Sequence, residues 1–123
     1  MNIFEGKVVE TGAETVVELP GGGRATVAVA SEAGDRSATV RLGVRPEDLG
    51  PVEGNALFAG DISIVEALGE TTLLHFAPQH EDLPVIAKLP GIHGFKRGET
   101  VHLGADPAKL HLFGADGLSY YHR

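Results

Sequence analysis

Histidines are the side chains of this 123-residue chain best suited to metal chemistry, and six are present. Neutral imidazole is a common zinc ligand, but a zinc site gathers several ligands, usually through a close helical pair or a Cys/His signature. The histidine spacing matches neither pattern, so surface or barrel-edge positions are the preferred interpretation. A meeting of His102 with His111 on neighbouring strands is the alternative. The full set is His75, His80, His93, His102, His111 and His122.

The other chemically capable residues show no catalytic pattern. Cysteine is absent, which excludes thiolate chemistry and disulfides. Glu66, near the end of a predicted strand, is interpreted either as a solvated edge charge or as a contact for a partner, because an acid–base pair requires a proximity that the sequence does not establish. The four serines lack the strand-turn-helix setting of a nucleophile elbow; they are Ser31, Ser37, Ser63 and Ser119. We therefore predict no catalytic residue and no enzyme activity in this chain.

A loop that binds nucleotide phosphates is also missing. Such a loop combines a glycine-rich backbone with a following lysine and a hydroxyl residue. Gly6-Lys7 has no upstream glycine and is followed by Val8. The run from Gly21 to Arg24 stands between two predicted strands, so it is interpreted as a turn, with anion binding as the alternative. We expect no cofactor and no metal to bind within these residues.

Charge and aromatic content argue against nucleic acid as a partner. With 17 acidic and 10 basic side chains, the net charge is −7, and the basic residues are scattered along the chain. A phosphate backbone is repelled by such a charge. The five phenylalanines and two tyrosines do not alternate with basic residues, as a surface for single strands would require. No apolar run approaches the roughly 20 residues that span a bilayer, and the lack of cysteine fits a reducing compartment. We expect a soluble, cytoplasmic chain.

Short strands must position these residues. The 17 glycines and seven prolines separate β-branched segments, which is typical of an all-β barrel. No segment has the period of a long amphipathic helix. Two strands flank a glycine-rich turn at residues 20–23 and predict a hairpin. The predicted strands are 2–10, 15–19, 24–29, 38–45, 57–68, 71–76, 84–88, one around 101–103 and one near 109–113.

The clearest period-two alternation lies between residues 38 and 45. It places Val40, Leu42 and Val44 on one face, which predicts a half-buried strand. Gly69 suits a tight turn between the strands that precede and follow it, because such a turn needs a positive φ angle.

Proline ends that alternating strand and begins a turn. Pro46 removes a donor from the ladder and suits a first helical position, so residues 46–49 predict one helical turn. We expect the Arg45 guanidinium to pair with Glu47 or Asp48, which would tie the strand exit to the turn. Recognition of a partner by Arg45 is the alternative.

Three motifs in order resemble a known family. Leu42–Leu49, which contains Arg45-Pro46-Glu47, is similar to a segment in the accessory domains of carbohydrate ABC importer ATPases. Val65–Thr71 resembles their Val-Glu-x-Leu-Gly turn. Gly98–Leu103 and Leu110–Gly117 resemble their closing region. The resemblance covers almost the whole chain and is strongest with the ATP-binding subunits of maltose and glycerol-3-phosphate importers.

The resemblance implies a C-terminal TOBE/OB-fold regulatory domain over residues 1–123. Its fold would be two small intertwined barrels with short helical turns, at about residues 1–50 and 56–123. The nucleotide-binding domain, with its ATP and Mg²⁺, would lie in a part of the parent protein that is not in this chain. The chain is then expected to be an excised segment or a standalone paralogue of an importer for sugars or glycerol-phosphate-like solutes.

Contacts, rather than chemistry, are the function that the resemblance implies. The parent ATPase would form a homodimer through this domain on the inner face of the cell membrane, bind the membrane subunits and offer surfaces to a regulatory protein. The positions expected to make such contacts are Gly60, Glu66, Gly98, Gly104 and Phe113. The alternative is a sensor for an oxyanion or a sugar between the barrels, in which Arg41 and Arg45 would serve.

Overall fold

The computed structural model describes residues 1–19, 23–77 and 84–120. Across these ranges the chain forms strands and single 3-10 turns without an α-helix, which confirms the all-β prediction, and no helix there could span a membrane. The turns are η1 (Ala33–Asp35), η2 (Pro46–Asp48) and η3 (Pro107–Lys109). The strands are β1 (Asn2–Glu10), β2 (Thr15–Glu18), β3 (Arg24–Val27), β4 (Thr39–Val44), β5 (Gly50–Pro51), β6 (Phe58–Ala67), β7 (Thr71–Phe76), β8 (Val85–Pro90), β9 (Thr100–Gly104) and β10 (His111–Gly114).

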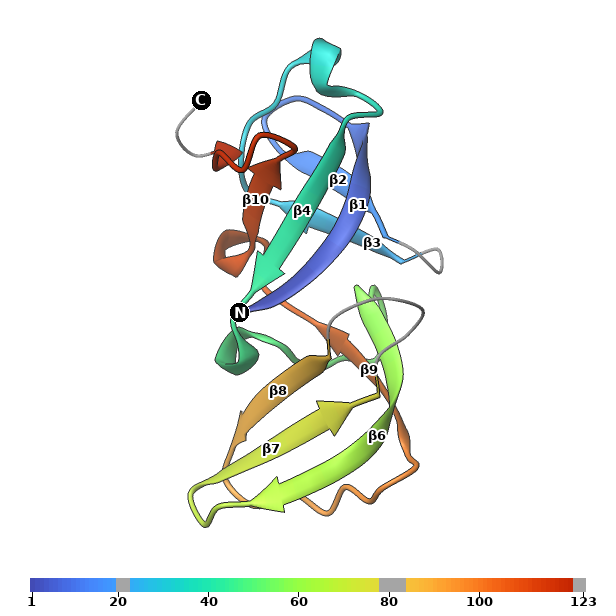
Figure 1. Ribbon diagram of the computed structural model, residues 1–123, viewed down its shortest axis with the longest axis vertical. Helices are drawn as coiled ribbons and strands as arrows, with labels where there is room; N and C mark the ends of the chain where they lie inside the picture. The colour runs from blue at the N-terminus through green and yellow to red at the C-terminus, as the bar shows by residue number, and fades with distance from the viewer. Residues whose placement is uncertain (20–22, 78–83, 121–123) are drawn as a thin grey trace.

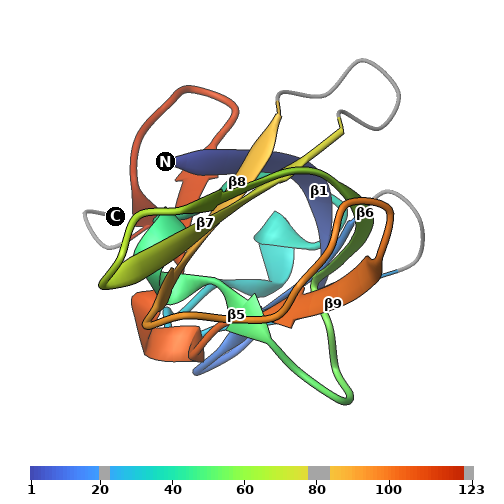
Figure 2. The ribbon, with the colours of Figure 1, turned by 90° about the horizontal axis from the view of Figure 1, so that it is seen from below.

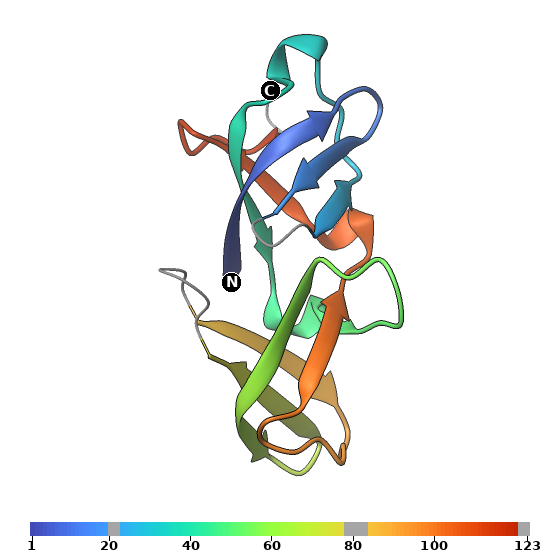
Figure 3. The ribbon, with the colours of Figure 1, turned by 90° about the vertical axis from the view of Figure 1, so that its right-hand side faces the viewer.

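Two five-stranded sheets form two lobes, one above the other (Figure 1 and Figure 3). The first sheet has the order β10-β4-β1-β2-β3 and the second β5-β9-β6-β7-β8. Seen from below, the strands of the second sheet curl around a common axis (Figure 2). Two curled, five-stranded antiparallel sheets match the OB-fold-like barrels expected from the sequence.

The chain crosses between the lobes twice, once between β4 and β5 and once between β9 and β10. The second crossing was not expected from the division into residues 1–50 and 56–123, which placed β10 in the second barrel. In the structure β10 pairs with β4 of the first sheet, from His111 opposite Gly43 to Gly114 opposite Val40. The physical reason is burial: Leu112 lies opposite Leu42, and both are fully buried in the first lobe. The end of the described chain therefore completes the first barrel.

The predicted alternation in β4 is confirmed. Val40, Leu42 and Val44 are each 0% exposed, whereas Arg41 on the other face is exposed. Both neighbours in the sheet, β1 and β10, are antiparallel to β4. Burial of three aliphatic side chains on one strand contributes several kcal/mol, at about 1.5–3 kcal/mol each.

The predicted hairpin pairing and the turn at Gly69 also form. β2 pairs with β3 from Thr15 opposite Val27 to Glu18 opposite Arg24, and the tip of this hairpin, residues 20–22, lies outside the described residues. Gly69 joins β6 to β7 with a φ of 85°, a value at which a side chain would be strained.

The turn after β4 is held differently from the expectation for Arg45. Pro46 occupies the first turn of η2, and the backbone N–H of Asp48 donates to the carbonyl of Arg45 at 2.9 Å. Leu49, 1% exposed, anchors the end of the turn in the core. The described residues contain no ion pair of Arg45 with Glu47 or Asp48, so that expectation is wrong. The backbone hydrogen bond and the buried Leu49 hold the turn without an ion pair, and the Arg45 side chain stays exposed.

A side-chain amide joins the two lobes. Asn2, at the start of β1, is 5% exposed, and its Nδ2 donates to the carbonyl oxygen of Ile86 at 2.8 Å. The N–H of Ile86 donates back to Asn2 Oδ1 at 2.9 Å. β8 is the last strand of its sheet. The Asn2 amide hydrogen-bonds its free edge at Ile86, as the backbone of a neighbouring strand would, and so covers part of that edge.

Candidate functional site

Backbone geometry accounts for the glycines expected to make contacts. A Cβ atom on Gly60 would lie 2.7 Å from the Phe58 ring, and one on Gly104 would lie 3.0 Å from Val52. Gly98 has a φ of 91°, and its N–H donates to the carbonyl of Ile62 at 2.8 Å. The local surroundings therefore favour glycine at each of the three positions, and a contact role for them stays a prediction.

Phe113 and Glu66 lie on different lobes. Phe113 is half-buried on β10 in the first sheet, where its ring approaches Gly43 beside Met1. Glu66 is exposed near the end of β6 in the second sheet. The structure thus does not gather the five expected contact residues into one surface. The family-motif residues Arg45, Pro46 and Glu47 lie at η2, between the lobes.

The solvent-facing side of β6, β7 and β8 is the best-defined candidate surface. The strand register places its side chains in two rows across the sheet, Ile64–His75–Ile86 and Glu66–Leu73–Lys88. The opposite side of the same strands is buried in the core. We call this surface the outer face; its residues are Ile64, Glu66, Leu73, His75, Ile86 and Lys88.

A β-bulge creates part of the outer face. Ile62 pairs with Phe76 and Ile64 with His75, so Ser63 is an extra residue on β6. Its Oγ donates to the carbonyl of His75 at 3.0 Å. The extra residue turns Ile64 outward, to 55% exposed, although Ile62 is buried at 2%. Sequence reasoning missed Ile64, because strict alternation from Ile62 would have buried it.

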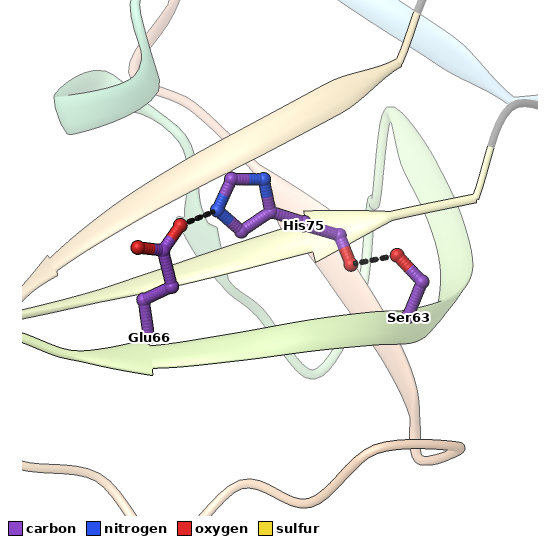
Figure 4. A network of polar contacts seen from close by, with 3 residues as sticks. All are labelled: Ser63, Glu66 and His75. Carbon is purple, nitrogen blue, oxygen red and sulfur yellow. Dashed lines mark hydrogen bonds and ion pairs between the residues drawn. The ribbon is translucent and has the colours of Figure 1, made fainter.

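Glu66 has a partner on the neighbouring strand. Its Oε1 lies 2.5 Å from Nε2 of His75 on β7, and the two side chains are 45% and 26% exposed (Figure 4). Exposed pairs of this kind contribute little to stability. Glu66 therefore has His75 as its partner on the outer face.

Metal binding receives no support from the described residues. No group of three or more potential ligands gathers among them. His102 lies on β9 and His111 on β10, which belong to different sheets, so the alternative that they meet on neighbouring strands is wrong. His80 and His122 lie outside the described residues.

Two more exposed aliphatic side chains lie in the segments that follow β6 and β8, strands of the outer face. Leu68, in the turn after β6, is 56% exposed, and Ile92, after β8, is 81% exposed. These two segments meet, because the N–H of Gly91 donates to the carbonyl of Glu70 at 2.6 Å. Of the five large exposed hydrophobic side chains among the described residues, Ile64, Leu68 and Ile92 belong to the second lobe, and a group of such side chains is a common mark of protein contact surfaces.

Comparison with known sequences identifies the family. The sequence profile of the TOBE domain matches residues 42–113, more than half of the chain. The chain belongs to the TOBE domain family. The matched range runs from β4 to β10 and so includes both crossings between the lobes.

Relatives of this TOBE domain include ATP-binding proteins of sugar transport. The alpha-glucoside transport ATP-binding protein AglK of Rhizobium meliloti is 47% identical over 98% of this chain and 33% of its own length. The sulfoquinovosyl glycerol transport protein SmoE of Agrobacterium fabrum is 36% identical over 74% of this chain and 25% of its own. The maltose/maltodextrin import ATP-binding protein MalK of Vibrio vulnificus is 31% identical over 95% of this chain and 32% of its own length. The chain spans about a third or less of each relative, and the resemblance inferred from its motifs is confirmed.

The fold has a close counterpart among solved structures. The cytoplasmic molybdate-binding protein ModG superposes with a TM-score of 0.71 over 90% of this chain and 94% of its own, at 15% identity. At that identity the likeness extends to the fold alone. It confirms the barrel architecture of this TOBE domain.

Proposed function

We propose that this TOBE domain is a non-catalytic regulatory and dimerisation domain of the ATP-binding subunit of an ABC importer for sugars or glycerol-phosphate-like solutes. The observation that carries the proposal is the match of 98% of the chain to one third of an ATP-binding protein for alpha-glucoside transport. ATP and Mg²⁺ then bind in the remaining part of the parent protein. The parent binds its membrane subunits at the inner face of the cell membrane, where a regulatory protein can reach this domain.

The outer face is the surface proposed to pair with its counterpart in a second copy. Glu66, Leu73 and Lys88 form one row across three strands. A two-fold axis that runs parallel to the strands over Leu73 places Glu66 of each copy opposite Lys88 of the other. A symmetric interface must be self-complementary in this way. The apolar side chains of the neighbouring row supply burial, with the sheets packed in an aligned manner.

Sedimentation equilibrium of the isolated chain at concentrations up to about 1 mM tests this proposal. Lys88→Glu places two pairs of like charges across the interface, so the dissociation constant of the dimer is expected to rise about tenfold. Adding Glu66→Lys restores the opposite charges and is expected to recover the affinity. Glu5→Lys, on an exposed position of β1, is the matched control and leaves association unchanged.

Two outcomes contradict the proposal. A chain that remains monomeric at 1 mM has no intrinsic dimer surface. Association that is insensitive to Lys88→Glu, or that the double reversal does not recover, places the contact elsewhere. Calorimetric titration with Mg·ATP provides the companion test of the non-catalytic role, because micromolar nucleotide binding by this chain would overturn it.

A further inference from the structure

A groove lies where the two lobes meet. Its volume is about 550 Å³, which falls within the range of about 300–1,000 Å³ that is usual for small-molecule sites. It is lined by residues 47–49 of the first crossing and 50–52 in and after β5, by Gly104 at the end of β9 with residues 105–106 of the second crossing, and by residues 88–90 of β8. Both connections between the barrels therefore form its walls.

The polar lining of the groove is rich in hydrogen-bonding groups of both kinds. Carboxylates come from both crossings and accept hydrogen bonds, whereas an ammonium and an amide donate them. Pro51 and Pro90 add apolar surface. The polar side chains that line it are Glu47, Asp48, Asn55, Lys88, His93 and Asp106.

Two of these groups, Asp106 and His93, are held in place by their own neighbours. Asp106 Oδ1 accepts a hydrogen bond from the N–H of Ala108 at 2.9 Å, which caps η3. The His93 ring stacks on Phe95 with 5.8 Å between centroids, and its Nε2 lies 2.7 Å from the carbonyl oxygen of Pro90. Fixed polar groups reduce the ordering that a ligand would otherwise impose on binding.

The charge of the lining discriminates between ligand classes. Glu47, Asp48 and Asp106 supply three carboxylates, whereas Lys88 supplies one ammonium. An oxyanion such as molybdate or phosphate is repelled by this balance. A neutral polyhydroxylated molecule is not, because its hydroxyls donate to carboxylates and accept from the ammonium and the amide.

We propose that the groove between the barrels binds a neutral polyol of sugar size, and that an α-glucoside is the chemical class it takes. The choice of an α-glucoside rests on the proposed function; the choice of a neutral polyol over an oxyanion rests on the lining alone. A ligand in the groove contacts both crossings and so favours one relative placement of the two barrels. The site would let the domain respond to imported solute.

Titration of the isolated chain with maltose, followed by calorimetry and by thermal unfolding, tests the proposal. Saturable one-to-one binding is expected, and the melting temperature is expected to rise with maltose concentration. Glu47→Gln combined with Asp48→Asn removes two charged acceptors from η2 and is expected to weaken binding about tenfold or more. Glu5→Gln, a carboxylate outside the groove, is the matched control and leaves the affinity unchanged. Sodium molybdate and phosphate, as separate probes, are expected not to bind.

Three results overturn the proposal: no binding of maltose at 50 mM, binding that is unaffected by the paired groove substitution, or binding of molybdate in place of maltose. Lys88 belongs to both surfaces, so the groove is tested through Glu47 and Asp48, which lie outside the outer face, and these results do not bear on self-association. A groove that fails and a dimerisation role that fails are therefore distinguishable.

Discussion

The Asn2 amide gives the sharpest test of how the two barrels are joined. Asn2 and Ile86 lie 84 positions apart in the chain, and Asn2→Ala removes both hydrogen bonds between them. The N–H and carbonyl of Ile86 then lose their partners at a partly buried edge of β8. A net loss of about 1 kcal/mol per hydrogen bond gives about 2 kcal/mol of destabilisation. For a domain of this size that corresponds to a fall of about 8 °C in melting temperature.

The assay is urea unfolding, combined with hydrogen exchange of the Ile86 amide measured by NMR. Asn2→Ala is expected to lower the free energy of unfolding by about 2 kcal/mol and to speed exchange selectively at Ile86. Asn2→Asp keeps the shape but replaces the donor with an acceptor facing the Ile86 carbonyl, so it is expected to destabilise at least as much. Glu5→Ala, exposed on the same strand, should stay within about 0.5 kcal/mol of the parent. Unchanged stability and unchanged Ile86 protection in Asn2→Ala would show that the amide does not hold the two lobes together.

Three further substitutions test the packing of the second lobe. Gly60→Ala places a methyl group 2.7 Å from the Phe58 ring and should cost about 1–3 kcal/mol in chemical unfolding, so a neutral effect would show that the ring moves aside freely. Gly98→Ala forces a side chain onto a φ of 91° and should lower the free energy of unfolding by about 1–2 kcal/mol. Its control is Gly94→Ala, where the added Cβ meets no atom within 4 Å. Equal losses in the two variants would show that the positive φ of Gly98 causes no strain. Glu66→Gln removes the charge from a pair whose carboxylate is 45% exposed and should change stability by less than about 0.5 kcal/mol, so a loss above 1 kcal/mol would show that the pair matters structurally.

Local pattern was sufficient to predict most strands and turns. The alternation in β4 depends only on which side chains are aliphatic, and each of its three inward residues is fully buried. Gly69 was predictable because a positive φ selects glycine locally. The three motifs were sufficient to predict the family, since they are short and lie in a fixed order.

Features that depend on distant pairing could not be predicted. His111–Gly114 has the same local pattern whether it joins the first sheet or the second, and only the packing of Leu112 against the first core decides. The bulge at Ser63 changes which side chains face outward without changing composition. The Asn2 amide looks like any polar residue near a terminus until β8 is placed beside it. The groove is formed by two crossings that are distant in sequence.

Complementation by a chimera shows whether this chain works as a contact domain in an importer. In the alpha-glucoside transport ATP-binding protein of Rhizobium meliloti, the matching third is replaced by this chain, and alpha-glucoside uptake is measured in cells that lack the native protein. A contact domain without chemistry of its own predicts uptake near the native level for the chimera, reduced uptake when Lys88→Glu is introduced, and recovery with Glu66→Lys added. A chimera that accumulates normally and hydrolyses ATP, yet supports no uptake, would contradict the account.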